Sequence, residues 1–176
     1  MFARKVSAML LRPLTILTAS TLAWPVAAAS RDLKAHAHGH VTLQIAVEGD
    51  AVEMALEAPG ADIVGFEHAA KTDAQKAAVA EAQSTLADPL SLFVLPMAAG
   101  CVVADAEVEL HQDAQHSAFE ARYRLTCQDP SALAQIGTRL FDLYPSVQEI
   151  EVEYVTPAGQ GAAEMAPGTA LTLPVS

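Results

Sequence analysis

The chain has 176 residues, a formal net charge of −11 at pH 7 and a hydrophobic residue content of 52%. A strongly acidic chain repels nucleic acid and anionic lipid headgroups and attracts cations, so we expect no nucleic-acid partner. The length is enough for one domain with a sizeable buried core.

Residues 1–29 have the pattern of a secretory signal peptide. Three basic residues precede an apolar run over residues 14–24 and an Ala-x-Ala cleavage site at residues 27–29. The run is too short for a stable membrane anchor. We therefore expect a cleaved leader and a periplasmic mature protein, residues 30–176, that forms a single domain without a membrane span. Its charge would be −14, because 7 Lys and Arg remain against 21 Asp and Glu.

Three of the six histidines, His36, His38 and His40, stand at alternate positions just before an alternating apolar segment. On an extended backbone such positions share one face, so the sequence predicts a row of imidazoles about 7 Å apart from Cα to Cα. Neutral imidazole is the commonest metal ligand, and short His-rich tracts are typical of metal sites. The alternative interpretation is a solvated His tract near the new N-terminus.

A β-hairpin is predicted after this tract. Residues 41–48 alternate between apolar and polar side chains, and the histidines fall on the polar face. Gly-Asp at residues 49–50 is a two-residue turn signal, and residues 52–57 alternate again as the partner strand. The sequence therefore predicts a hairpin with one buried face and one polar face.

The return of this hairpin has a consequence for the metal site. It should place Glu57 beside His40, and it should bring the loop over residues 63–68 back toward the first strand. His68, at the end of that loop, is then a candidate fourth ligand. A loop histidine that hydrogen-bonds to backbone is the alternative interpretation.

Helix signals follow in two places. A capping-box pattern begins a helix over residues 74–86, which is rich in helix-forming residues. An Asp-Pro pair at residues 88–89 predicts a second, short helix. The same pair at residues 129–130 predicts a further helix over residues 131–141. We expect the apolar residues of these segments to pack in the core, and we find no candidate catalytic or binding residues among them.

The chain has two cysteines: Cys101 opens one predicted strand, and Cys127 closes the next. In an exported chain an even pair of cysteines predicts a disulfide bond. Closing a loop of roughly 25 residues should stabilise the fold by ~3–4 kcal/mol. A pair of cysteine metal ligands is the alternative, and it would require both thiols to escape oxidation during export.

The connection between the two cysteine-bearing strands has a histidine at each end. If residues 111–116 turn back as a hairpin, His111 and His116 face one another and are close enough to share an ion. An ordinary solvated turn explains the segment equally well.

The last strong strand signal lies at residues 147–155, where Glu149, Glu151 and Glu153 share one face. Weaker strands are predicted over residues 161–165 and 171–173. Taken together, the elements predict the α+β class, with a mostly antiparallel sheet and helices packed on one face.

Five segments of the chain, in this order, resemble the ZrgA family of bacterial periplasmic proteins associated with zinc uptake. They are His-x-His-Gly-His at residues 36–40, Val-Gly-Phe-Glu-His at 64–68, Gly-Cys at 100–101, Phe-Glu-Ala-x-Tyr-x-x-x-Cys at 119–127 and Leu-Phe-x-x-Tyr-Pro at 140–145. The resemblance implies zinc binding in the periplasm in support of an ABC importer and its periplasmic zinc solute-binding protein. Many members carry a long His- and Asp-rich insertion between the cysteine-bearing strands, which here is reduced to residues 111–116.

The functional interpretation is therefore a zinc-binding accessory or carrier protein. Zn²⁺ takes imidazole and carboxylate ligands, whereas Cu²⁺ and Ni²⁺ also accept imidazole, and only the family resemblance favours zinc. We do not expect an enzyme, because the sequence contains no His-Glu-x-x-His, Gly-x-Ser-x-Gly or P-loop motif. An envelope protein-interaction or structural module with incidental histidines is the alternative. The candidate zinc ligands are His36, His38, His40, His68, His111 and His116.

Overall fold

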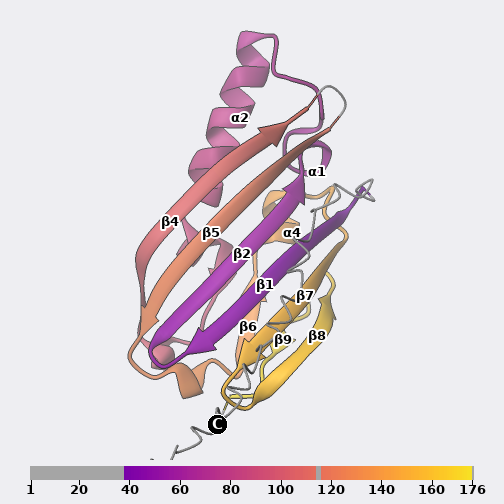
Figure 1. Ribbon diagram of the computed structural model, residues 1–176. Coiled ribbons are helices and arrows are strands. Elements are labelled where there is room, and N and C mark those ends of the chain that lie inside the picture. Colours follow the sequence, from indigo (N-terminus) through magenta and orange to yellow (C-terminus); the bar gives the residue numbers. More distant parts are fainter. Residues whose placement is uncertain (1–37, 114–115, 176) are drawn as a thin grey trace, which may run out of the picture. The chain divides into compact units, whose positions relative to one another are not determined.

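The computed structural model describes residues 38–113 and 116–175, so the predicted signal peptide and His36 lie outside the described residues. A six-stranded sheet of order β4-β5-β2-β1-β7-β8 dominates the fold (Figure 1). Its strands are β1 (His40–Glu48), β2 (Ala51–Pro59), β4 (Cys101–Gln112), β5 (Ser117–Cys127), β7 (Glu149–Thr156) and β8 (Gly159–Met165). Neighbouring strands are antiparallel except β1 and β7, which run parallel. The sheet is therefore mixed, and the fold belongs broadly to the α+β class.

The predicted hairpin is confirmed as β1 and β2, joined by a two-residue turn. In β1 the alternate side chains Val41, Leu43 and Ile45 are almost fully buried, and the residues between them are exposed. Thr42 pairs with Glu57, so the end of β2 lies beside the start of β1 as expected. The period-two pattern of the sequence thus sets which face of the sheet is polar.

The helices are short apart from one. They are α1 (Gly60–Val64), α2 (Asp73–Leu86), α3 (Pro89–Leu92) and α4 (Leu140–Leu143). The predicted capping box is present at α2, where Thr72 and Gln75 each bind the other's backbone N–H. Asp88 caps α3 through its side chain, as the Asp-Pro pair predicts. In the described part of the chain no helix is long and apolar enough to cross a membrane.

The predicted helix over residues 131–141 is wrong. The Asp-Pro pair starts only a 3-10 turn, η2 (Pro130–Ala132), and the chain then becomes strand β6 (Gln135–Thr138) before α4. β6 pairs with β3 (Phe93–Val94) on one side and with β9 (Leu171–Thr172) on the other. Its Gly and Thr are weak helix formers, and a Cβ on Gly137 would lie 3.3 Å from the Val94 side chain, so close strand packing decides the conformation.

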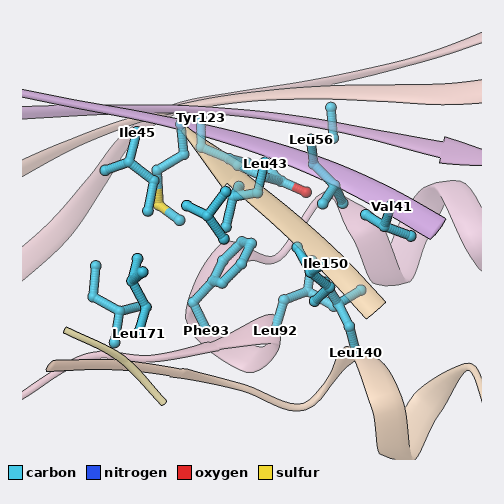
Figure 2. Close-up of a cluster of buried hydrophobic side chains, with 14 of the residues drawn as sticks. Val41, Leu43, Ile45, Leu56, Leu92, Phe93, Tyr123, Leu140, Ile150 and Leu171 are labelled. Carbon is cyan, nitrogen blue, oxygen red and sulfur yellow. The ribbon is translucent and has the colours of Figure 1, made fainter. Parts of the chain in front are cut away.

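The apolar face of the large sheet packs against these smaller elements. Figure 2 shows side chains of β1 meeting residues from the small sheet and the short helices. The contributing residues shown there are Val41, Leu43 and Ile45 of β1, Leu92 of α3, Phe93 of β3, Leu140 of α4 and Leu171 of β9. All are buried in one cluster, so the opposite, polar face is left for solvent.

One buried hydrogen bond ties α2 to the sheet. The Tyr123 hydroxyl of β5 donates to the carbonyl oxygen of Leu86 at 2.9 Å. Desolvation, with a smaller contribution from Tyr144, raises the pKa of Tyr123 above its ordinary value. The hydroxyl therefore keeps its proton and remains a donor across the physiological range.

The predicted disulfide is confirmed between Cys101 of β4 and Cys127 of β5, which face each other as a cross-strand pair. It joins positions 26 residues apart in the sequence. Its loss would leave the β4–β5 hairpin to be held by the strand ladder and side-chain packing alone.

We predict that the double variant Cys101→Ser/Cys127→Ser is less stable than the wild type by about 3–4 kcal/mol, because the unfolded chain regains the entropy of the open loop. Urea unfolding followed by circular dichroism measures this difference. Wild-type protein with a reducing agent is the matched comparison, and its urea midpoint should fall as well. An unchanged urea midpoint in both samples would contradict the prediction.

Candidate metal centre

The polar face of the large sheet carries a cross-strand row of six residues, one from each strand, and five of them are glutamates. Each member of the row is paired with the next in the strand register, and the members are Glu109, Glu120, Glu57, Thr42, Glu151 and Glu164. Like charges directly opposite one another destabilise a sheet. Such a row therefore favours any cation that binds between its members, and it concentrates cations near this face.

One end of β1 brings a histidine to this row. His40 pairs with Glu149 in the parallel register of β1 and β7, and Glu151 follows two residues later on the same face. His40 Nδ1 lies 3.5 Å from Glu149 Oε1. One ligand atom from each of the three residues lies within 4.8 Å of the others. A tetrahedral zinc site with bonds of about 2.0–2.1 Å has ligand atoms separated by about 3.3 Å, so only small side-chain adjustments would complete the group.

Gly39 fixes the position of His40. Its backbone N–H donates to the buried carboxylate of Asp62 in α1, at 2.8 Å from Oδ2. Its carbonyl oxygen accepts the N–H groups of Gln148 and Glu149, at 2.8 and 3.0 Å. Gly39 has a φ of 85°, a conformation that other residues rarely adopt. The backbone before His40 is thus held against both α1 and the start of β7.

The same turn breaks the predicted row of histidines. Because Gly39 is left-handed and β1 begins at His40, His38 lies in a turn rather than on the extended strand. The His38 side chain is exposed, with its Nδ1 4.0 Å from Glu67 Oε1. The equally spaced row over residues 36–40 is therefore wrong at His38, and His38 and His40 face different carboxylates.

The loop that contains Glu67 does return to the start of β1, as predicted from the hairpin. His68 itself points to its own loop, where its Nδ1 lies 3.0 Å from the carbonyl oxygen of Ala69. Its ring stacks on Phe66 with the centroids 5.2 Å apart. Among the described residues His68 belongs to no group of three potential ligands, and its ligation stays a prediction.

The β4–β5 hairpin holds a second group of potential ligands. His111 Nε2 lies 3.3 Å from Glu109 Oε2 and 3.6 Å from Glu120 Oε2. The register places Ala118 opposite His111, so His116 does not face it. His116 instead lies beside Asp113, with 3.7 Å between Nδ1 and Oδ1. The two histidines of this connection therefore enter different surroundings, and the ion shared between them is not supported.

The carboxylates of both groups were not predicted as ligands from the sequence. The alternation at Glu149 and Glu151 indicated a polar strand face, but nothing in the sequence told which strand would lie beside it. For the second group the sequence did contain a signal. Glu109 is two residues before His111 on one predicted strand, so the two side chains must lie on the same face.

Comparison with models of protein families identifies a family that matches most of the chain. The model of a family described as ZrgA family zinc uptake protein matches residues 35–172, a range that includes both groups of ligands. No curated protein matches the chain.

We predict that Asp62→Ala lowers the free energy of unfolding by about 1–3 kcal/mol, because the buried N–H of Gly39 loses its acceptor. Asp62→Asn keeps an oxygen acceptor and should lower the free energy of unfolding by less, so it is the matched control. Urea unfolding gives the stability, and hydrogen exchange at the Gly39 amide reports the local effect. Equal stability of the alanine variant and the wild type, with unchanged exchange, would show that the contact does not hold the turn.

Proposed function

The chain belongs to the ZrgA family of zinc uptake proteins, and we propose that it captures Zn²⁺ at His40, Glu149 and Glu151. The observation that carries the proposal is the approach of one imidazole and two carboxylates on an acidic, solvent-facing sheet. These are ligand types that Zn²⁺ accepts. Two carboxylates also balance the charge of one divalent ion.

The arrangement suits capture and release better than permanent retention. Three protein ligands leave a tetrahedral ion with one open position, which water or a ligand from an acceptor protein would fill. The His40 side chain is 42% exposed and that of Glu149 is 34% exposed, so an incoming ligand can reach the ion. We therefore propose a carrier that passes zinc on by ligand exchange, rather than an enzyme.

Family membership in zinc uptake supports a proposal for the cellular setting. We propose that the protein acts in the periplasm after cleavage of its signal peptide, and that it delivers zinc to a solute-binding protein or directly to an ABC importer. The Cys101–Cys127 disulfide supports an oxidising compartment. Cu²⁺ and Ni²⁺ would be accepted by the same ligand types, so the family alone favours zinc over them.

We predict that His40→Ala lowers the zinc affinity of the first site by at least about 10–100-fold, the loss typical of removing even an outer partner of a metal ligand. Glu151→Gln should weaken binding in the same direction. Glu153→Gln is the matched control, because Glu153 lies two residues further along the same face and belongs to neither group of potential ligands. Titration with zinc against a chromophoric chelator measures all three variants. If the His40→Ala variant folds and binds zinc as the wild type does, the site lies elsewhere, with His38 and His68 the next candidates.

We also predict that zinc affinity falls between pH 7.5 and pH 5.5. A protonated imidazole has no lone pair for the metal, and an ordinary histidine titrates near about pH 6.5, so acidification adds a proton that zinc must displace. The affinity of the His40→Ala variant should depend less on pH over this range. An affinity of the wild type that is independent of pH would point to carboxylate ligands alone.

A further inference from the structure

The second group of ligands differs from the first because a permanent cation is bound to it. Arg122 lies next to Glu120 and Glu109 on the polar face. Its Nη2 is 2.9 Å from Glu120 Oε2, and its Nη1 is 3.5 Å from Glu109 Oε2. The guanidinium therefore bridges the two carboxylates of the group.

The oxygens that Arg122 contacts are the same ones that approach the histidine. Glu109 Oε2 lies 3.3 Å from His111 Nε2, and Glu120 Oε2 lies 3.6 Å from it. These separations are close to the distance of about 3.3 Å between two ligands of a tetrahedral zinc ion. An ion bound here would need the two oxygens that the guanidinium now occupies.

The first group has no such competitor among the residues that the structure describes. In residues 38–113 and 116–175, no ion pair joins Glu149 or Glu151 to a lysine or an arginine. Both groups place two carboxylates next to one histidine on the same sheet face. What separates them is therefore the charge on Arg122, which is retained at every physiological pH.

We propose that Glu109, His111 and Glu120 form a second divalent-cation site, and that Arg122 competes with the metal for it. Two glutamates paired across β4 and β5 repel each other, and a positive partner relieves that repulsion. The guanidinium supplies it when metal is scarce. When metal is abundant, the divalent ion displaces the guanidinium and gains the imidazole of His111 as a third ligand. The site then fills after the first one and adds capacity at high zinc concentration.

The proposal takes from the proposed function only the identity of the metal, and its residues are separate from the first site. Arg122 and His111 are half-exposed, so each ion pair is weak in solvent and displacement is feasible. Removing the guanidinium should tighten binding about fivefold to tenfold, as expected for two weak ion pairs lost together. Arg122→Lys keeps the charge but loses the two-point contact, and should fall between the wild type and Arg122→Gln.

The test is a zinc titration of the full mature protein against a chromophoric chelator, with stoichiometry and both dissociation constants as the readout. The wild type should bind two ions with unequal affinity. Arg122→Gln should tighten the weaker site about fivefold to tenfold, and His111→Ala should abolish it. Arg124→Gln is the matched control, since it removes an equal charge from the same strand face, where Arg124 pairs with Glu53 at 3.1 Å. It should change the weaker site less than about twofold.

Three results would overturn the second site. They are a single bound ion in the wild type, a weaker site that survives His111→Ala, and equal effects of Arg122→Gln and Arg124→Gln, which would mean a general charge effect. The combination with His40→Ala separates this proposal from the first one. If His40→Ala changes nothing while the Arg122 and His111 variants act as expected, the second site stands and the first is wrong. A thermal melt of each variant confirms that the fold is retained.

Discussion

The backbone of Gly39 is the point on which the rest of the molecule's polar face depends. Its carbonyl oxygen accepts two N–H groups from the start of β7, and its own N–H donates to Asp62 of α1. Three segments that are far apart in the sequence meet there. A parallel pair such as β1 and β7 cannot be joined by a tight turn and needs a long crossover, and the Gly39 contacts hold the first step of its register. Only in that register does His40 stand opposite Glu149.

Neighbouring carboxylates repel one another on the acidic face, and the two groups of potential ligands differ in what offsets this repulsion. A row that includes five glutamates across the six strands is unfavourable by itself, because neighbouring carboxylates repel. At the β4–β5 end a guanidinium relieves the repulsion. Where β1 meets β7, no lysine or arginine of the described residues pairs with Glu149 or Glu151, and a divalent ion is the partner that we propose there. In our proposal the same sheet thus has two positions for a divalent cation. Arg122 contacts the carboxylates of one of them, and no described arginine or lysine pairs with those of the other.

Much of the local structure was predictable because its causes are local. Alternation predicted β1 and its hairpin, a capping box predicted the start of α2, and the pair of cysteines predicted the disulfide. The helix expected over residues 131–141 failed because β6 is stabilised by two strands distant in sequence. The row of histidines failed at His38 because the left-handed Gly39 ends the extended backbone there.

The site was predictable only in part, for a related reason. The histidines can be recognised as candidate ligands from their residue type and spacing. Which carboxylates face them depends on which strands become neighbours. Glu149 is 109 residues from His40 along the chain, and no periodic pattern connects the two. The role of Arg122 was likewise hidden, since its contacts are visible only once the β4–β5 register is known.

The most direct test of the first site is to locate the metal. Crystals of the mature protein grown with one equivalent of zinc would be measured at the zinc absorption edge, so that anomalous scattering marks the ion. We expect the strongest peak between His40 Nδ1 and the carboxylates of Glu149 and Glu151, at about 2.0–2.2 Å from each ligand atom. A strongest peak beside His38, Glu67 and His68, with no density at His40, would show that the sheet face is not where zinc is captured.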